Sequence, residues 1–350
     1  MAHKTKFLAA AAVAALPNTV LAEGLERNNL DANFLFTEGS AAELSIGNVS
    51  PTLPATLPAA LGGSKIDNVA GGFQIMTTSA KTSIGDNLDL GLWYTNQGNG
   101  VDIDWGATIG IKAQVSLSTL AGMARYKLNE NYSLIGGIKQ VNVASGGEVN
   151  LSGTEWTMGS TSATGTVIGV AYERPEVAAR VVLTSEAAID LKIPTKVNGV
   201  SGVDSVGGVG DAINLSFQTG IAPDTLLFGN FRSSNWADNQ LTLSGASTPV
   251  STFEDGNSWS LGVGRKLFDS LSVSASYFSD PGDGNGVSEL SPTGGTSSVS
   301  LGARYSLSDA ATLSLGATMS QKGDATTSTL GAETSGIRVN IVGAKISIKF

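Results

Sequence analysis

The chain contains no cysteine, and its only histidine is His3, close to the amino terminus. The absence of cysteine excludes a disulfide framework, thiolate chemistry and a lipid-anchored cysteine. His3 falls in a segment that we expect to be removed, so the mature chain has no imidazole for a Ser-His-Asp triad, a metal site or a general base. We therefore predict a protein that is not an enzyme and that needs no metal and no cofactor.

Basic side chains are in the minority, with 21 Lys and Arg against 30 Asp and Glu. Removing Lys4 and Lys6 from that total leaves 19 basic residues against 30 acidic ones, a net charge of −11. Such a balance argues against a nucleic-acid partner and against a basic helix on a membrane surface. Hydrophobic residues make up 41% of the chain and charged residues only 15%, which argues against disorder despite 44 glycines.

No apolar run is long enough to cross a bilayer as a helix, which needs roughly 20 residues. The longest candidate, Phe7 to Leu16, follows Lys4 and Lys6 and precedes the small-residue sequence Val20-Leu21-Ala22. This order is typical of a secretory signal peptide. We predict cleavage after Ala22 and divide the chain into a signal peptide (1–22), an N-terminal segment (23–40) and one further domain (41–350).

Beyond residue 40, apolar and polar residues alternate at period 2, which is typical of strands with one apolar face. In the last stretch, one face carries Val342, Ala344, Ile346, Ile348 and Phe350. No helical period is sustained, so we predict an all-β chain. We place fourteen strands at about 41–50, 69–82, 88–97, 113–128, 132–144, 163–173, 177–193, 212–222, 225–236, 258–266, 271–279, 298–307, 311–321 and 337–350.

The connections between these strands alternate between short turns and long loops. An even strand number with short turns at one end and long loops at the other is the pattern of bacterial outer-membrane barrels. Closing the sheet into a barrel also removes strand edges, whose unpaired backbone groups would be costly in lipid. We therefore predict a transmembrane antiparallel β-barrel of about 14 strands in the bacterial outer membrane, with residues 23–40 as a short N-terminal hatch.

The polar face of the strands is rich in Gly, Ser and Thr, which suits a barrel lumen better than a solvent-exposed surface. In the run 177–193, we place Val181, Leu183, Ser185, Ala187, Ile189, Leu191 and Ile193 on the lipid side. We expect six charged residues in the lumen: Arg125, Arg180, Glu186, Asp190, Lys192 and Arg304. Six tyrosines near strand ends fit an interfacial aromatic girdle: Tyr94, Tyr126, Tyr132, Tyr172, Tyr277 and Tyr305.

The order of these features resembles the FadL/TodX family of outer-membrane transport proteins. The best local match is 167–193, VIGVAYERPEVAARVVLTSEAAIDLKI, which is similar to the sixth and seventh strands of that family. The segment 220–243, with Trp236, is similar to the following hairpin. The likeness covers most of the mature chain, by spacing more than by identity. The N-terminal segment is shorter than the family hatch and lacks its Asn-Pro-Ala motif.

The resemblance implies uptake of hydrophobic small molecules, such as long-chain fatty acids or aromatic hydrocarbons, with lateral exit through a kink in the third strand. In that strand Gly91, Gly98 and Gly100 are the candidate lateral gate, because glycine weakens strands and accepts bulges. Within the N-terminal segment, Phe34, Leu35 and Phe36 are candidate ligand contacts. A ligand carboxylate would bind a basic side chain in an apolar pocket. The candidates are the arginines whose positions in the alternating strands direct them to the lumen: Arg125, Arg180 and Arg304.

Our function prediction is therefore an outer-membrane channel for hydrophobic small molecules, released laterally or to the periplasm. Its expected partners are that ligand, outer-membrane lipid with lipopolysaccharide, and the barrel-assembly machinery, for which the terminal Phe350 would be the assembly signal. We expect a monomer. The alternatives are a passive porin for small hydrophilic solutes and, less directly, adhesion by the long loops.

Overall fold

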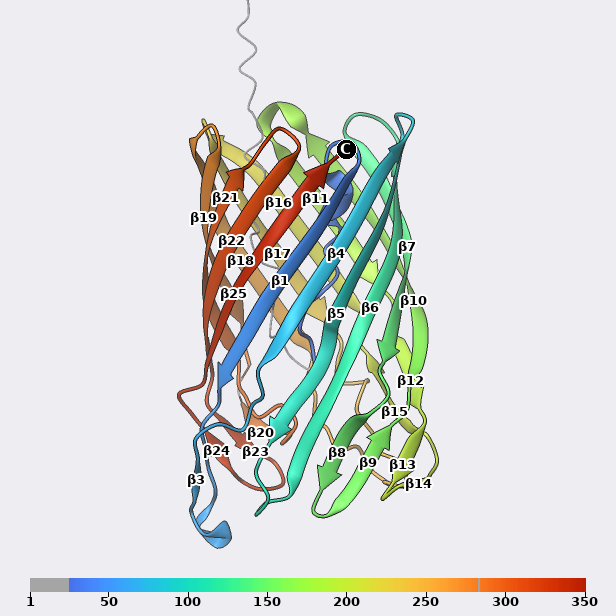
Figure 1. Cartoon of the computed structure of the whole chain (residues 1–350), viewed down its shortest axis with the longest axis vertical. Helices are drawn as coiled ribbons and strands as arrows, with labels where there is room; N and C mark the ends of the chain where they lie inside the picture. The colour runs from blue at the N-terminus through green and yellow to red at the C-terminus, as the bar shows by residue number, and fades with distance from the viewer. Residues whose placement is uncertain (1–24, 283) are drawn as a thin grey trace, which may run out of the picture.

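Fourteen tilted strands form a closed barrel in the computed structural model, which describes residues 25–282 and 284–350 (Figure 1). Every neighbouring pair of wall strands is antiparallel, and the last strand pairs with the first from Ala41↔Lys349 to Thr52↔Arg338. The predicted fold class and strand number are confirmed. The wall strands are β1 (Ala41–Thr52), β4 (Phe73–Ile84), β5 (Leu88–Asp104), β6 (Ile111–Lys127), β7 (Tyr132–Val143), β10 (Thr161–Arg174), β11 (Ala179–Glu186), β16 (Ala212–Ala222), β17 (Thr225–Ser234), β18 (Gly256–Phe268), β19 (Leu271–Asp280), β21 (Thr296–Ser306), β22 (Ala311–Lys322) and β25 (Arg338–Lys349).

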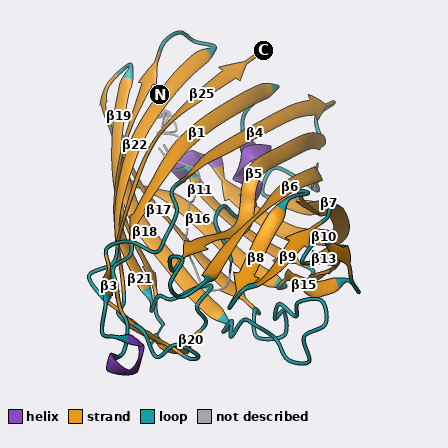
Figure 2. Ribbon diagram, turned by 60° about the horizontal axis from the view of Figure 1, so that its bottom comes forward, coloured by secondary structure: helices purple, strands orange, loops and turns teal. Residues whose placement is uncertain are grey.

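The short turns and the carboxy terminus lie at one end of the barrel, and the long connections lie at the other (Figure 1). We call these the turn end and the loop end. Figure 2, which is turned toward the loop end, shows the connections gathered across it. Among the described residues, no helix is long and apolar enough to cross a membrane.

The loop end carries small strands of its own. Hairpins prolong the wall there, and a separate five-stranded sheet joins connections that are far apart in sequence. These elements are β2 (Ala55–Thr56), η2 (Ala59–Leu61), β3 (Lys65–Ile66), β8 (Gly147–Leu151), β9 (Thr154–Met158), β12 (Ile189–Ile193), β13 (Thr195–Val197), β14 (Val200–Ser201), β15 (Ser205–Val209), β20 (Asn285–Val287), β23 (Ala325–Thr327) and β24 (Glu333–Thr334). At the turn end, η3 (Pro175–Val177) connects β10 to β11.

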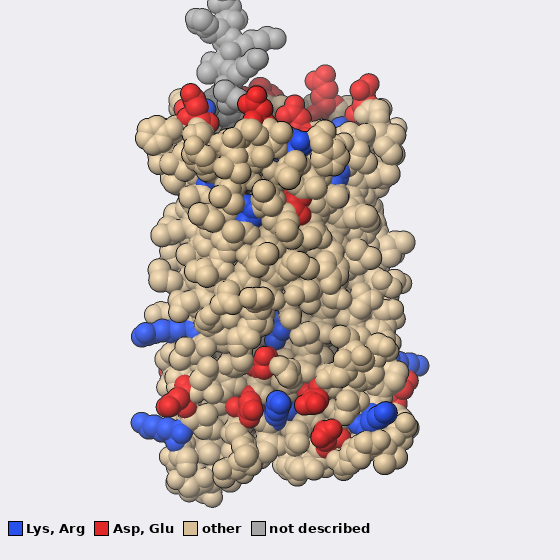
Figure 3. Space-filling model, viewed as in Figure 1, with Lys and Arg blue, Asp and Glu red and all other residues tan. Residues whose placement is uncertain are grey.

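The outside of the wall exposes many large apolar side chains, and charged side chains lie mostly toward the two ends of the barrel (Figure 3). In β25, Val342, Ile346 and Ile348 are exposed, as predicted for the lipid face, and so is the terminal Phe350. Arg338 and Asn340 share that outward face near the loop end. Such a surface is what a membrane-spanning barrel presents to hydrocarbon.

The seventh predicted strand was wrong in its outer half. Wall strand β11 ends at Glu186, and β12 begins at Ile189 in a separate two-stranded pairing with β15. Ile189 and Leu191 point into the protein at 1% and 2% exposure, although they share the parity of the exposed Leu183. Asp190 and Lys192 are correspondingly exposed rather than in the lumen. The reason is that apolar residues face lipid within the bilayer but face a protein core beyond it.

Candidate functional site

The N-terminal segment, described from residue 25 to residue 40, runs inside the barrel. Its first residues pair with the inner side of β5: Glu26 forms a bridge with Asn99, and the amides of Arg27 and Asn28 donate to the Gly98 carbonyl at 3.0 Å. Its middle forms the short helix η1 (Ala32–Phe36), which Asp31 caps through a hydrogen bond from the Asn33 amide. The segment therefore takes its shape from the wall that surrounds it.

β5 has an irregularity where the N-terminal segment meets it. Pairing with β6 shifts register between Thr95↔Thr119 and Asn99↔Leu117, so β5 carries two extra residues there. Pairing of β4 with β5 also stops at Thr77↔Thr95 and resumes only at the isolated bridge between Ala70 and Ile103. The wall thus has a local interruption between β4 and β5, at the third-strand position where the sequence predicts a kink.

Arg27 of the N-terminal segment fills this interruption. Its guanidinium lies 3.9 Å from the centre of the Phe73 ring on β4 and donates to the Gln97 side chain on β5 at 2.5 Å. Burial lowers the pKa of Arg27 to about 10, and the Asp102 carboxylate acts in the opposite direction. The Arg27 cation therefore lies beside the stretch where backbone pairing of β4 with β5 is missing, and the Asn96 side chain bridges the same stretch by accepting from the Met76 amide at 2.7 Å.

The three candidate gate glycines have different surroundings. The Gly98 carbonyl accepts the two backbone hydrogen bonds from the N-terminal segment, and a side chain at this position would overlap Thr119. Gly100 has φ +157° and faces the Val115 carbonyl, so both backbone and space require glycine. Gly91 lies away from the interruption, where a Cβ would overlap the Phe34 ring and lie 2.9 Å from Leu35 Cδ2. Gly98 and Gly100 thus belong to the interruption, and Gly91 to the seat of η1.

A buried layer of paired charges crosses the lumen beside this interruption. Arg232 on β17 bonds Glu26 of the N-terminal segment at 2.6 Å and Glu186 of β11 at 3.0 Å. Glu186 also pairs with Lys139 of β7 at 2.5 Å and accepts from Asn214 at 2.8 Å. Charges removed from water are stable only when they are paired and hydrogen-bonded, as these are.

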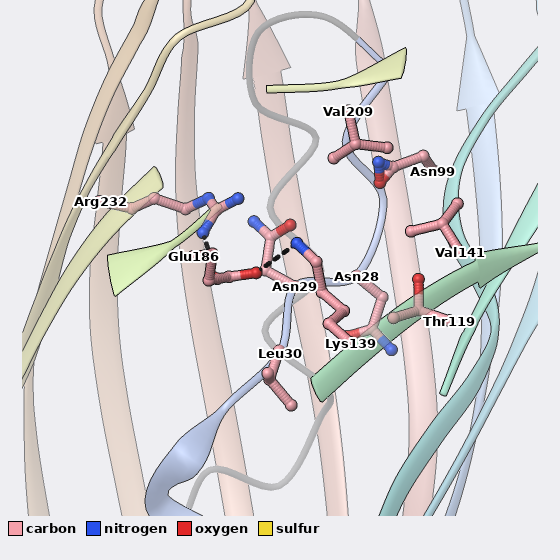
Figure 4. A pocket seen from close by; sticks show the side chains of 10 residues that line it. All are labelled: Asn28, Asn29, Leu30, Asn99, Thr119, Lys139, Val141, Glu186, Val209 and Arg232. Atoms are coloured by element: carbon pink, nitrogen blue, oxygen red, sulfur yellow. Dashed lines mark hydrogen bonds and ion pairs between the residues drawn. The ribbon is translucent and has the colours of Figure 1, made fainter. Parts of the chain in front are cut away.

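A small void of about 10 Å³ lies within this polar layer, enough for about one water molecule. Figure 4 shows ten side chains around it, with Lys139 and Arg232 directed to Glu186. Asn99 lines the void, is 6% exposed, and has no hydrogen-bond partner for its Nδ2. Val141 and Val209 supply the apolar part of the lining.

On the loop side of the polar layer, the protein has a large apolar core, which we call the outer cluster. It joins residues of the wall strands to residues of the long connections, with Trp105 and Trp236 both 1% exposed. The Trp236 ring packs edge-on against Phe253 at 5.7 Å, and Trp105 Nε1 donates to the Glu289 carbonyl at 3.0 Å. The outer mouth is therefore lined and covered by apolar side chains.

On the turn side of the polar layer, η1 packs on the wall in a second apolar core, the inner cluster. The cluster contains Phe34 and Leu35 together with Trp93 of β5 and Met123 of β6, and Phe36 packs at its edge. Leu35 is fully buried. The three predicted ligand contacts thus lie together in the lumen, with Phe34 and Leu35 packed against the wall.

Two of the three predicted arginines meet at Phe36. The guanidinium carbons of Arg125 and Arg180 lie 4.0 Å and 4.6 Å from the centre of its ring. Arg125 also pairs with Asp89 and with Glu173, whereas Arg180 donates to Gln218.

Arg304 is separate from this pair of arginines. It is half-buried on β21, which is remote from β6 and β11 in the strand order. The structure therefore brings Arg125 and Arg180 together and leaves Arg304 elsewhere in the lumen.

The sequence reasoning missed the polar layer. Lys139 and Arg232 have the inward parity of their strands, so the rule that selected Arg125 and Glu186 would have selected them too. Their pairing with Glu26 had no local signal, because Glu26 lies outside the alternating strands and reaches Arg232 only in the closed barrel.

No protein-family model matches the chain, and no curated protein matches it by sequence. Among solved structures, a Pseudomonas aeruginosa FadL homologue superposes with a TM-score of 0.74 at 14% identity, covering 92% of this chain and 93% of that one. The Pseudomonas putida toluene transporter TodX superposes with a TM-score of 0.68 at 11% identity, covering 94% of this chain and 96% of that one. The chain has the fold of the FadL and TodX channels.

A third structure, the CymD monoaromatic hydrocarbon channel, gives a TM-score of 0.60 at 11% identity and covers 93% of this chain and 94% of that one. The match over the whole length of these channels confirms the predicted resemblance at the level of the fold.

Proposed function

We propose that this protein is an outer-membrane channel that takes up hydrophobic small molecules from outside the cell. The observation that carries the proposal is the outer cluster, an apolar core at the loop end that lies directly beside an interruption in the wall. An apolar solute gains free energy by leaving water for such a core, about 25 cal/mol per Å² of apolar surface buried. Polar solutes gain nothing there.

The proposed route leaves the barrel sideways. From the outer cluster, a ligand reaches the polar layer and meets the interruption between β4 and β5, which Arg27 fills in this structure. Gly98 and Gly100 form the gate in this proposal, because the N-terminal segment is bonded to the backbone of β5 at these residues. Displacing residues 25–28 would open the gap toward the lipid, or toward the turn end and the periplasm.

Uptake of apolar compounds by living cells tests the proposal. The protein is produced in the outer membrane of a host that lacks its own hydrophobic uptake channel, and uptake of radiolabelled dodecanoate and toluene is measured. We expect faster uptake of at least one of them than with the empty vector, and slower uptake when Gly100 is replaced by valine. Equal uptake with and without the protein would overturn the proposal.

Planar bilayers separate this proposal from a passive porin. The N-terminal segment and the two apolar clusters fill the lumen at successive levels, so we expect little steady ion conductance. Large, stable open-channel currents from the intact protein would favour a porin for hydrophilic solutes and would contradict the hydrophobic channel.

A further inference from the structure

The outer surface of four neighbouring strands changes from apolar to polar near the loop end. These strands are β22, β25, β1 and β4, which lie side by side in the wall (Figure 1). On each of them an exposed apolar residue is followed, two positions nearer the loop end, by an exposed amide side chain: Met319 by Gln321, Val342 by Asn340, Ile46 by Asn48 and Met76 by Gln74. The boundary between the hydrocarbon and the lipid head groups therefore crosses the four strands at that step.

Six exposed side chains make up this polar surface, which we call the outer polar patch: Gln74, Asn48, Ser50, Asn340, Arg338 and Gln321. Adjacent strands pair them directly, as Asn48↔Gln74, Ser50↔Asn340 and Arg338↔Gln321. Directly opposed residues of antiparallel strands have Cβ atoms about 4.5–5.5 Å apart. Asn48 Nδ2 also donates to Ser50 Oγ at 2.9 Å. The patch is therefore continuous over the four strands.

The charge and hydrogen-bonding groups of the patch suit a phosphorylated sugar. Arg338 is its one ionisable side chain, and among the described residues no carboxylate pairs with it. A guanidinium donates two parallel hydrogen bonds to a phosphate. The other members are four amides and one hydroxyl, which can both donate and accept, as sugar hydroxyl groups require.

Another part of the wall presents different chemistry to lipid. In the loop-end halves of β17, β18 and β19, the exposed residues include Phe231, Trp259 and Tyr277, and the rings of Trp259 and Tyr277 lie 5.6 Å apart. Aromatic side chains of this kind are the usual contacts of a barrel with the membrane interface. The outer polar patch is therefore a local feature of β22, β25, β1 and β4.

We propose that the outer polar patch binds the phosphorylated sugar head of an outer-leaflet glycolipid, the class to which lipopolysaccharide belongs. Arg338 binds a phosphate of the head, and Asn340 and Asn48 bind sugar hydroxyls. The acyl chains lie against the exposed apolar residues on the turn side of the patch. The site requires the loop end to face the outside of the cell, as in the proposed function, and it is independent of what the channel transports.

The test compares diphosphoryl lipid A with phosphatidylglycerol, which are both anionic lipids and of which only the first carries its phosphates on a sugar. Each lipid is titrated into the purified full-length protein in detergent, and bound lipid is measured by native mass spectrometry. Arg338→Gln removes the charge and keeps a hydrogen-bonding side chain. We expect it to weaken lipid A binding about five-fold, the usual effect of one basic residue at an anionic lipid surface. Arg265→Gln is the matched control, since Arg265 is exposed on β18 near the turn end, and it should change binding less than about two-fold.

A second variant tests the sugar contacts at constant charge. Asn48→Leu combined with Asn340→Leu removes two hydrogen-bonding side chains, and we expect about ten-fold weaker binding of lipid A with phosphatidylglycerol unchanged. Heat-modifiable mobility on gels checks that each variant barrel is folded.

The proposal is overturned if the wild type does not bind lipid A, or if Arg338→Gln and Arg265→Gln affect its binding equally. It is also overturned if the asparagine double variant loses both lipids to the same extent, because the patch would then not recognise the sugar. Uptake of hydrophobic molecules is measured separately, so a failure here leaves the proposed function standing.

Discussion

Replacing Gly91 with alanine tests whether η1 is seated on β5 as described. The glycine faces inward beneath the helix, and an added methyl group would overlap the Phe34 ring and approach Leu35 Cδ2 to 2.9 Å. Real Cβ atoms do not come so close to their neighbours, so the ring must move. Leu35 is fully buried and cannot move without taking η1 with it.

The expected cost follows from the size of the overlap. One extra methylene in a well-packed core costs about 1–3 kcal/mol, and each 1.4 kcal/mol is a factor of ten in an equilibrium constant. The wall strand is held on both sides by antiparallel pairing with β4 and β6, so the strain falls on the N-terminal segment. Opening of η1 should become about 5- to 150-fold more frequent.

Hydrogen–deuterium exchange of residues 32–37 in detergent measures this opening directly, because amide exchange reports local unfolding. Gly136→Ala on β7 is the matched control, since no atom lies within 4 Å of a Cβ built there. Phe34→Leu in the Gly91→Ala background shortens the clashing ring and should restore protection. Heat-modifiable mobility on gels checks that the barrel itself remains folded.

The outcome that would refute this reasoning is specific. If Gly91→Ala and Gly136→Ala exchange at the same rate over residues 32–37, η1 is not packed on Gly91 as the geometry requires. The inner cluster would then give no account of why glycine stands at this position of β5.

Three further changes follow from the same structure. Trp105→Ala should destabilise the protein by about 3–5 kcal/mol, as for other buried aromatic residues. It leaves a cavity in the outer cluster and leaves the Glu289 carbonyl without its donor, so the unfolding temperature should fall. An unchanged unfolding temperature would contradict this packing. Lys81→Met removes the nearest of the three cations around Asp89, at 2.8 Å, while Lys127 and Arg125 remain at 3.3 Å and 3.7 Å. It should therefore cost less than the about 3–5 kcal/mol of a buried charge left without any partner, visible as a lower denaturant midpoint. Phe350→Ser should reduce the folded fraction in the outer membrane, and normal insertion would refute its proposed role as assembly signal.

Most of the wall could be predicted from the sequence because lipid imposes one rule on every strand. Outward residues must be apolar and inward residues can be small and polar, so period 2 persists through each strand. The even strand number and the alternation of turns and loops then determine closure. In β25 the alternation identifies single residues: Val342 and Ile348 of the apolar face are exposed, and Lys345 of the opposite face pairs with Glu43 at 3.5 Å.

The same rule fails where the wall leaves the membrane. Leu183 and Ile189 share a parity, yet the first is exposed to lipid and the second is buried in the outer cluster. The sequence pattern does not distinguish lipid from a protein core, because both reward apolar side chains. The two environments are separated only by the break at residues 187–188, which are both alanines and carry none of the residues typical of turns.

The N-terminal segment could not be placed from sequence for a related reason. Residues 25–40 have no period of their own, and their contacts are with strands far along the chain, such as Glu26 with Arg232 and Asn33 with Ser216. Each of these pairs forms only after the barrel has closed. The predicted apolar cluster of Phe34, Leu35 and Phe36 was visible as a run of large residues, but its seat on Gly91 was not.

Two irregularities of the wall lie where the N-terminal segment crosses it. The register shift of β5 ends at Asn99, and β11 separates from β12 just after Glu186. Asn99 and Glu186 line the same small void, so the two breaks lie at one level of the barrel. Both residues are bound to Glu26 or to its partner Arg232. The segment pairs with the backbone of Asn99 and supplies the Glu26 carboxylate to Arg232, which is the partner of Glu186. The Glu26 carboxylate and backbone therefore hold the N-terminal segment at the level of both breaks.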